Sequence, residues 1–209
     1  MPGAVAGNFT KARFNVKDIP DLTGRVAIIT GGNTGMAARN PARADEAIQA
    51  IKGSDPAANI VHLQLDLSDL NSVKKAAEEF LSISAELPNS QVMATPYSET
   101  PQGYEIQWGT NYMGHYLLTR LLLPIMLSTA STAPKGSVRI VNVSSYGHEL
   151  LAPKIGINFD DVNMKEEEGT WARYGQSKLA NVLHAKALAD KYGDKNILTA
   201  SLHPGSVNT

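Results

Sequence analysis

The sequence contains no cysteine among its 209 residues. Disulfide bonds, thiol catalysis and thiolate metal sites are therefore excluded. Aromatic residues are also scarce, at 6%. The five histidines are scattered along the chain without the spacing of metal ligands, so we expect no metal site.

Neither sign of charge predominates, because the net charge is −1 and charged residues make up 19% of the chain. Such a chain has no electrostatic attraction for nucleic acid or anionic lipid, and we expect neither as a partner. No apolar run is long enough for a secretory signal or a membrane span. The most apolar stretch, residues 117–126, is interrupted by Arg120 and Pro124 and suits a buried helix better. The sequence thus predicts a cytoplasmic protein without a transmembrane segment.

The hydrophobic content of 43% is that of an ordinary soluble protein with a sizeable core. Residues 1–23 indicate a polar N-terminal arm, and residues 24–209 indicate a single domain. Short β-branched runs alternate with longer amphipathic stretches, which is typical of an α/β fold with a parallel sheet. We expect strands at 25–30, 59–67, 137–144 and 197–203, and helices at 41–52, 68–85, 104–128 and from 171 onward.

Tyr174 and Lys178 stand four residues apart in the last expected helix. Side chains at this spacing share a helix face. A free tyrosine exchanges its proton only near pH ~10, but a neighbouring cation favours the phenolate. The pair is therefore a candidate for general acid/base chemistry. The same short pattern also fits a tyrosine at the edge of the core beside a solvated lysine.

A glycine-rich turn follows the first expected strand, between Gly31 and Met36. Glycines let the backbone approach a phosphate, and the N-terminus of the next helix binds its charge. An ordinary turn at the end of a strand explains the same residues. The dinucleotide-binding unit takes ~30 residues, whereas Arg39 and Pro41 follow here almost at once.

Six segments stand in a recognisable order along the chain: Thr30–Gly35, Asp66, Asn111–Tyr116, Arg139–Ser145, Tyr174–Lys178 and Pro204–Thr209. Each segment is weak evidence alone, but the ordered set resembles the short-chain dehydrogenase/reductase family. The similarity covers roughly residue 20 to the end of the chain. It is greatest to the retinol-dehydrogenase-like branch, which uses NADP. The resemblance implies a Rossmann-like parallel sheet flanked by helices.

The resemblance also implies a reaction, which is hydride transfer between NADP(H) and a carbonyl or alcohol substrate. Tyr174 would give or take the proton of the hydroxyl, and Lys178 would assist it and hold the nicotinamide ribose. Ser145, or its neighbour Ser144, would bind the substrate oxygen. Asn111 would bind a water in the proton relay. In the absence of the resemblance, these serines fit a turn at a strand end, and Asn111 fits an ordinary helix.

The same resemblance implies the residues that bind the cofactor. They are Gly31, Asn33, Thr34, Gly35, Met36, Arg39, Asp66, Arg120, Tyr174, Lys178, Val207 and Thr209. Arg39 would pair with the 2′-phosphate of NADP, whereas an acidic residue there would select NAD. Asp66 would lie near the adenine, although an aspartate at a strand end often only forms a turn. Arg39 also fits a solvated residue at the start of a helix.

The chain departs from the family pattern at three places. Ala37 stands where the third glycine of the phosphate loop is expected, and the helix and second strand that should follow are largely missing. The segment that ends the fourth strand is missing before Val92, and the chain ends at Thr209, where the family continues. We therefore expect an incomplete fold whose second strand, fourth strand and C-terminal part are largely missing. The intact flanks of both internal gaps indicate two clean excisions.

The truncation relative to the family leaves an alternative to the oxidoreductase open. The protein can instead be a catalytically inactive family member that is non-functional or acts only as a binding protein. A hydrolase with Ser145 as nucleophile is disfavoured, because neither a Gly-x-Ser-x-Gly segment nor a matching histidine and acid is present. The resemblance implies a possible homodimer through helices 104–128 and 171–192.

Overall fold

The computed structural model describes residue 26 and residues 41–56, 60, 62–83, 93, 95–165 and 169–205. The elements in chain order are α1 (Pro41–Ser54), α2 (Leu70–Ile83), α3 (Ile106–Trp108), the π-helical turn η2 (Gly109–Met113), α4 (Gly114–Thr132), β1 (Val138–Val143), α5 (Gly147–Leu150), α6 (Thr170–Tyr192), the 3₁₀ turn η3 (Gly193–Lys195) and β2 (Ile197–Leu202). None of the helices in these ranges is long and apolar enough to cross a bilayer. The predicted N-terminal arm and strand 25–30 fall outside the described residues, apart from Val26.

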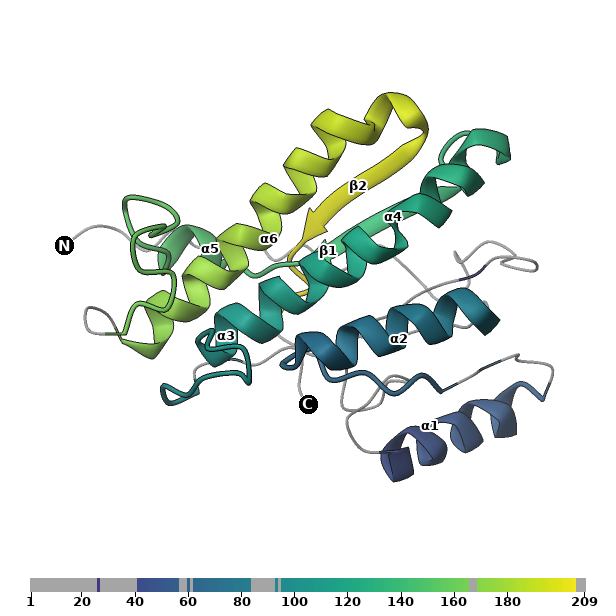
Figure 1. Ribbon diagram of the computed structural model, residues 1–209, viewed down its shortest axis with the longest axis horizontal. Coiled ribbons are helices and arrows are strands. Elements are labelled where there is room, and N and C mark those ends of the chain that lie inside the picture. The colour runs from purple at the N-terminus through teal and green to yellow at the C-terminus, as the bar shows by residue number, and fades with distance from the viewer. Residues whose placement is uncertain are drawn as a thin grey trace.

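β1 and β2 pair in parallel, in a register that runs from Val138 opposite Ile197 to Val143 opposite Leu202. Helices α5 and α6 lie between the two strands in the chain, so they form the crossover that a parallel pair requires (Figure 1). Helices α4 and α6 both contact the sheet. Leu123 of α4 and Leu188 of α6 form one buried cluster with Ile197 of β2. The predicted strands 137–144 and 197–203 and their parallel direction are confirmed.

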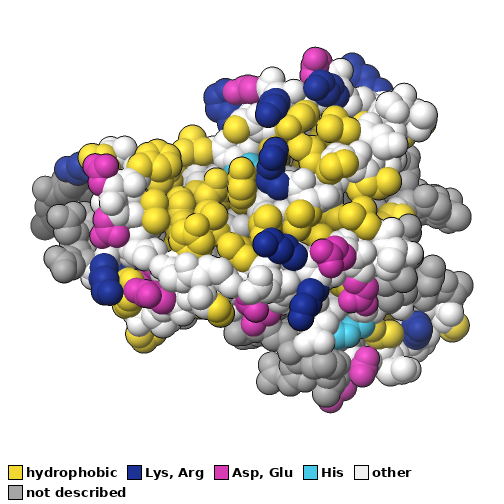
Figure 2. All heavy atoms as spheres, viewed as in Figure 1, with side chains coloured by type: hydrophobic (Ala, Val, Ile, Leu, Met, Phe, Trp, Pro, Cys, Tyr) yellow, Lys and Arg dark blue, Asp and Glu magenta, His cyan; other side chains and the backbone are white. Residues whose placement is uncertain are grey.

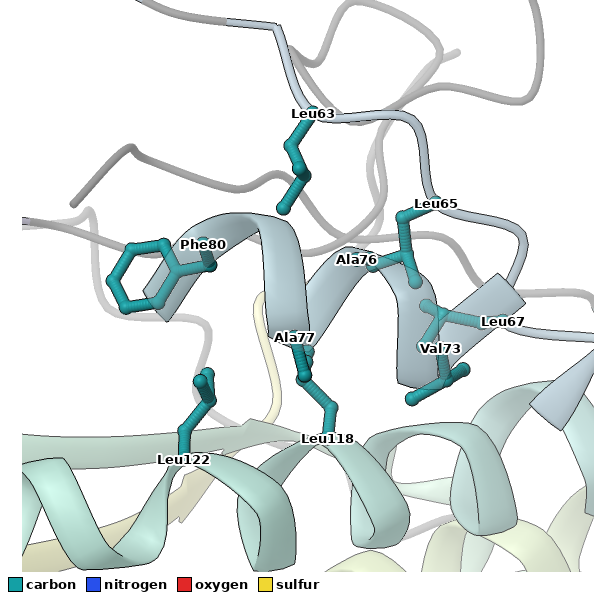
Figure 3. Packing of buried hydrophobic residues seen from close by; sticks show 9 residues of the cluster. All are labelled: Leu63, Leu65, Leu67, Val73, Ala76, Ala77, Phe80, Leu118 and Leu122. Atoms are coloured by element: carbon teal, nitrogen blue, oxygen red, sulfur yellow. The ribbon is translucent and has the colours of Figure 1, made fainter. Parts of the chain in front are cut away.

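A second apolar cluster joins the segment before α2 to α2 and α4 (Figure 3). Its buried members are Leu63, Leu65, Leu67, Val73, Ala76, Ala77, Phe80, Leu118 and Leu122. Gly114 at the start of α4 lets the helix approach this cluster, because a Cβ there would lie 2.3 Å from the carbonyl oxygen of Leu67. This packing places α4, and the π-helical turn that precedes it, against the core.

None of the described residues of the segment 59–67 is assigned to a strand, although the alternating pattern of the segment predicts one. Leu63, Leu65 and Leu67 are buried and Gln64 is exposed, so the alternation of burial is present. However, the only sheet among the described residues consists of β1 and β2. Alternation follows from packing one face of the segment against α2, and this does not require a hydrogen-bonded neighbour.

The predicted helix 68–85 is observed as Leu70–Ile83, with two corrections. Asp69 begins it in place of Ser68, because the Asp69 carboxylate accepts the backbone N–H of Asn71. Ser68 instead donates its hydroxyl to Asp66. The helical spacing of the apolar residues predicts that Leu81 faces inward together with Val73, Ala77 and Phe80. Leu81 is instead 50% exposed, because it lies outside the buried stripe that contains the other three.

The predicted helix 104–128 extends from Ile106 to Thr132 and is not uniformly α-helical. Glu105 caps its start, and residues 109–113 widen into the π-helical turn η2. Such turns occur frequently at functional sites. The helix at 41–52 is confirmed and continues to Ser54. The helix expected from Trp171 begins one residue earlier, at Thr170.

Candidate active site

The π-helical turn carries Asn111, whose side chain is fully buried. Its amide Nδ2 donates to Ser177 Oγ over 3.0 Å. The Ser177 hydroxyl in turn donates to the backbone carbonyl of Tyr174 over 2.8 Å. The widened turn is therefore joined directly to the part of α6 that carries the predicted tyrosine.

Helix α6 brings Tyr174 and Lys178 together, as their spacing predicts. The Lys178 ammonium lies 5.5 Å from the centroid of the Tyr174 ring. Lys178 is fully buried, and its Nζ donates to the carbonyl of Val143 at the end of β1 over 3.5 Å. The alternative of a solvated lysine is thus wrong for this pair.

Burial lowers the pKa of Lys178 to about 7, because the charged ammonium loses its hydration. The pKa of His115 is lowered to about 4, first by burial and then by the charge of Lys178. His115 Nδ1 lies 3.1 Å from the carbonyl oxygen of Thr110, one residue before Asn111. Near neutral pH, Lys178 can both hold and release a proton, whereas His115 is neutral.

Ser144 and Ser145 follow β1 and have different environments. The buried Ser144 hydroxyl donates to the backbone carbonyl of Lys178 over 2.8 Å. Ser145 is partly exposed, and its Oγ accepts the backbone N–H of Gly147 over 3.2 Å. The hydroxyl hydrogen of Ser144 thus already takes part in a hydrogen bond, whereas the hydroxyl hydrogen of Ser145 has no acceptor among the described residues.

The turn of α6 that carries Tyr174 packs closely against the end of α5. A Cβ at Gly175 would lie 2.4 Å from both the backbone nitrogen of Ala152 and the carbonyl carbon of Leu151. Trp171 meets the Tyr174 ring edge-on, with 6.3 Å between ring centroids. Tyr174 itself is 7% exposed. A glycine after the tyrosine is therefore needed for the close approach of these two segments.

Asn142 and Asn181 belong to the same polar cluster, although the sequence motifs had not indicated either as a site residue. Asn181 Nδ2 donates to the carbonyl of Val143 over 3.3 Å, and Asn142 Nδ2 donates to the carbonyl of Asn181 over 3.2 Å. Asn181 lies three residues beyond Lys178, on the same face of α6. An amide at that spacing, within a helix otherwise rich in alanine and leucine, was the available signal.

Asp66 and Arg120 are not joined to this cluster by any contact between described residues. The Asp66 carboxylate accepts the backbone N–H and the hydroxyl of Ser68, over 2.9 and 2.6 Å. This is the turn-forming role that its place before a helix also suggested. Arg120 lies on the exposed side of α4.

The remaining predicted cofactor residues lie outside the described residues. They are Gly31, Asn33, Thr34, Gly35, Met36, Arg39, Val207 and Thr209. Within the described ranges, no group of three or more histidine, aspartate or glutamate side chains could hold a metal ion. Of the predicted cofactor residues, the described part of the chain therefore contains only Asp66, Arg120, Tyr174 and Lys178.

The chain has clear similarity to curated proteins. It is 42% identical to the short-chain dehydrogenase/reductase drtF of Aspergillus calidoustus, in a match of 221 residues that covers 91% of this chain and 70% of drtF. It is 40% identical to an uncharacterized oxidoreductase of Schizosaccharomyces pombe, over 97% of this chain and 65% of that protein. The match to drtF is longer than the 209-residue chain, so drtF carries residues that have no counterpart here.

Solved structures also resemble this fold. An uncharacterized protein from Mycobacterium paratuberculosis is 30% identical with a TM-score of 0.73, covering 94% of this chain and 74% of that one. A 3-ketoacyl-(acyl-carrier-protein) reductase from Brucella melitensis, complexed with NADH, gives a TM-score of 0.62 at 22% identity, covering 88% of this chain and 76% of that one. The fold is Rossmann-like, and the described part is helix-rich with a short parallel sheet, which fits an incomplete α/β fold.

No protein-family model matches the chain. The identity to drtF nevertheless extends over most of both chains. In the structure Lys178 lies beside Tyr174, and Asn111 is linked through Ser177 to the same turn of α6. This chain therefore belongs to the short-chain dehydrogenase/reductase family of oxidoreductases.

Proposed function

We propose that this protein transfers a hydride between NADP(H) and a carbonyl or alcohol substrate by a Ser-Tyr-Lys-Asn mechanism. The observation that carries the proposal is the fully buried Lys178 beside Tyr174, with its pKa near neutrality. Burying an ammonium is costly, and perturbed groups of this kind are concentrated at functional sites. Asn111 and Ser177 support the same turn of α6.

The donors present fit a nicotinamide nucleotide. An ammonium at Lys178 and a hydroxyl at Tyr174, one helical turn apart, are suitable partners for ribose hydroxyls. A bound nicotinamide would supply or accept the hydride. Among the structural neighbours, a carbonyl reductase from chicken fatty liver is NADPH-bound, with a TM-score of 0.59 at 19% identity, covering 88% of this chain and 81% of that one.

The protein side chains would move the proton. Tyr174 gives its phenolic proton to the substrate oxygen in reduction and takes it back in oxidation. Lys178 stabilises the phenolate by its charge. Ser145 donates its hydroxyl hydrogen to the substrate oxygen, because that hydrogen has no acceptor among the described residues. The Ser144 hydroxyl, by contrast, already donates to the backbone carbonyl of Lys178. Asn111 binds a water of the proton relay.

The choice of NADP over NAD is proposed from Arg39. A guanidinium matches the 2′-phosphate, and an acidic residue at the same place would repel it. The variant Arg39→Asp is expected to bind NADPH more weakly and NADH at least as well. Unchanged NADPH affinity in this variant would remove Arg39 as the selector.

A homodimer through α4 and α6 is proposed as well. Apolar side chains gather over these two helices in Figure 2, and Tyr116, Ile125 and Leu183 are exposed large residues on them. Sedimentation should show a dimer that Leu183→Glu dissociates. Leu81→Glu, an equally exposed leucine on α2, should leave the dimer intact. A cytoplasmic location stays a prediction.

The test of the proposed reaction is Tyr174→Phe, assayed with NADPH and a panel of ketones and aldehydes. Loss of the phenolic hydroxyl should abolish turnover, because the proton donor is removed. NADPH should still bind, with an affinity lowered by at most about tenfold, because only one hydrogen bond to the ribose is lost and the other contacts to the cofactor remain. Retained turnover in Tyr174→Phe would assign the tyrosine a structural role. Cofactor binding without turnover in the wild type would favour the alternative of a catalytically inactive binding protein.

A further inference from the structure

A buried ion pair stands directly before the proposed catalytic tyrosine. Arg173 Nε lies 3.7 Å from Glu105 Oε1, and both side chains are buried. Arg173 precedes Tyr174 on α6, whereas Glu105 caps α3. The pair therefore bridges α6 to the helical segment that continues into the Asn111 turn.

The Glu105 carboxylate is held on several sides. Its Oε2 accepts the backbone N–H groups of Gln107 and Trp108, each over 2.9 Å. The backbone N–H of Glu105 donates to Asn163 Oδ1 over 2.8 Å. Burial raises the pKa of Glu105, against the lowering effect of these hydrogen bonds and of Arg173. These hydrogen bonds thus hold the carboxylate in place independently of Arg173.

The Arg173 guanidinium is held by the segment that leads into α6. Nη1 donates to the carbonyl of Met164 over 3.3 Å, and Nη2 donates to Thr170 Oγ1 over 3.4 Å. The Tyr97 ring lies against the guanidinium, 5.3 Å from its central carbon. A planar donor fork that uses several partners at once restricts rotation of the side chain more than a flexible ammonium would.

Two glutamines reinforce the same junction. Gln107 Nε2 donates to the carbonyl of Thr170 over 3.0 Å, which links α3 to the first turn of α6. Gln176 accepts the backbone N–H of Asn158 and donates to the carbonyl of Val162. The first two turns of α6 are thereby fastened to α3 on one side and to the preceding loop on the other.

Stability alone does not account for a buried ion pair. Desolvation of two charges offsets most of their attraction, and apolar residues of similar volume often serve equally well. Loss of one partner, by contrast, leaves an uncompensated buried charge. A pair of this kind adds directional restraint, and here the restrained element is the turn that carries Tyr174.

We propose that Glu105 and Arg173 are positioning residues that hold the first turns of α6 in register with the Asn111-bearing segment, and so set Tyr174 for proton transfer. Neither side chain is assigned contact with the substrate. The effect of the pair on proton transfer rests on the proposed function. Its effect on the position of α6 relative to the Asn111-bearing segment does not.

The variants that test the proposal are Glu105→Gln, Arg173→Met and the double variant. Glu105→Gln keeps an oxygen that can cap Gln107 and Trp108 but removes the charge. The matched control is Lys165→Met, which removes an exposed cation that also lies near Tyr97 and pairs with Glu99. The single variants are expected to lower the melting temperature, and the double variant to recover most of that loss, because it contains no unpaired buried charge.

The kinetic test separates positioning from stability. Both single variants and the double variant should lose roughly 10- to 100-fold in kcat, because small misplacements of a reacting group have effects of this size. The dissociation constant for NADPH should stay within about twofold, and Lys165→Met should behave as the wild type. If the double variant regains kcat together with its melting temperature, the pair is merely structural and the proposal is overturned.

A spectroscopic test needs no turnover. The chain has two tryptophans, and Trp108, whose backbone N–H donates to Glu105 Oε2, is 5% exposed. In a Trp171→Phe background, Trp108 is the only tryptophan, so emission excited at the red edge of tryptophan absorption, where tyrosine absorbs little, reports on the junction. Removing either partner of the pair should increase acrylamide quenching by roughly twofold through local opening, unlike Lys165→Met.

The two tests keep the possible failures apart. A wild-type protein without turnover, or one whose turnover survives Tyr174→Phe, contradicts the proposed function, and the quenching experiment then decides the positional claim alone. Unchanged quenching and emission of Trp108 in Glu105→Gln and Arg173→Met would overturn it, whatever the wild-type activity. Increased quenching in both, with Lys165→Met unchanged, supports it.

Discussion

Asn111 Nδ2 donates to Ser177 Oγ over 3.0 Å, and this bond joins the π-helical turn to the turn of α6 between Tyr174 and Lys178. The Ser177 hydroxyl in turn donates to the backbone carbonyl of Tyr174. Two segments distant in sequence are thereby aligned through one hydroxyl group. The geometry of the candidate site thus depends on a serine inside the Tyr-x-x-Ser-Lys pattern.

Replacing this serine should destabilise the fold. Ser177→Ala leaves the buried Asn111 amide without this acceptor, which should lower the free energy of unfolding by about 1–3 kcal/mol. Urea denaturation measures the change. Ser128→Ala, at an exposed position on α4, should change it by less than ~0.5 kcal/mol. Equal effects of the two substitutions would show that the Asn111–Ser177 bond contributes nothing to stability.

A methyl group at Gly175 should disturb the tyrosine turn. The new Cβ in Gly175→Ala would meet backbone atoms of Leu151 and Ala152, which cannot rotate away. We expect a loss of about 1–3 kcal/mol in unfolding free energy together with reduced turnover. Gly193→Ala is the control, because no atom lies within 4 Å of its added Cβ. A fully stable and active Gly175→Ala protein would contradict the observed packing of α5 against α6.

Acid should destabilise the protein through His115. Its pKa is lowered from 6.5 to about 4 in the folded state, so the unfolded chain binds more protons between these values. The free energy of unfolding should therefore fall as the pH drops from about 6.5 to 4. His115→Asn keeps a donor for the Thr110 carbonyl and removes the titration, so its pH dependence should be shallower. Chemical denaturation across this range measures both slopes, and identical slopes would exclude His115 as their source.

The leucines of α2 and α4 should differ sharply in their contributions. Leu118 is 4% exposed in the core, so Leu118→Ala should cost about 2–5 kcal/mol by creating a cavity. Leu81→Ala, at the exposed position that the helical pattern placed inward, should cost less than ~1 kcal/mol. Thermal and urea unfolding would test both. A large effect of Leu81→Ala would mean that a partner covers this leucine.

Local patterns predicted those features that depend on local spacing. The pairing of Tyr174 with Lys178 follows from the periodicity of one helix, and the parallel strands β1 and β2 follow from β-branched runs separated by a crossover. The separate roles of Ser144 and Ser145 could not be predicted, because they depend on which hydroxyl reaches the Lys178 carbonyl.

Features that depend on contacts between residues far apart in the chain could not be predicted from local patterns. The π-helical turn at 109–113 leaves no periodicity signal, since it shifts the register by only one residue. The Glu105–Arg173 pair joins positions far apart in the chain, and each residue alone resembles a solvated charge. Leu81 was misassigned because it lies at the edge of the apolar stripe of α2, and burial at that edge depends on what packs against the helix.

A thermal shift with NADPH and with NADH would show whether this chain forms the proposed nicotinamide-binding site. Ligand at about 100 times its dissociation constant should stabilise the fold by ~2.7 kcal/mol. For a domain of this size, that corresponds to roughly 5–10 °C in Tm. We predict this shift with NADPH and a smaller one with NADH. A cooperative transition that neither cofactor moves, or no cooperative transition at all, would contradict the proposed nicotinamide-binding site.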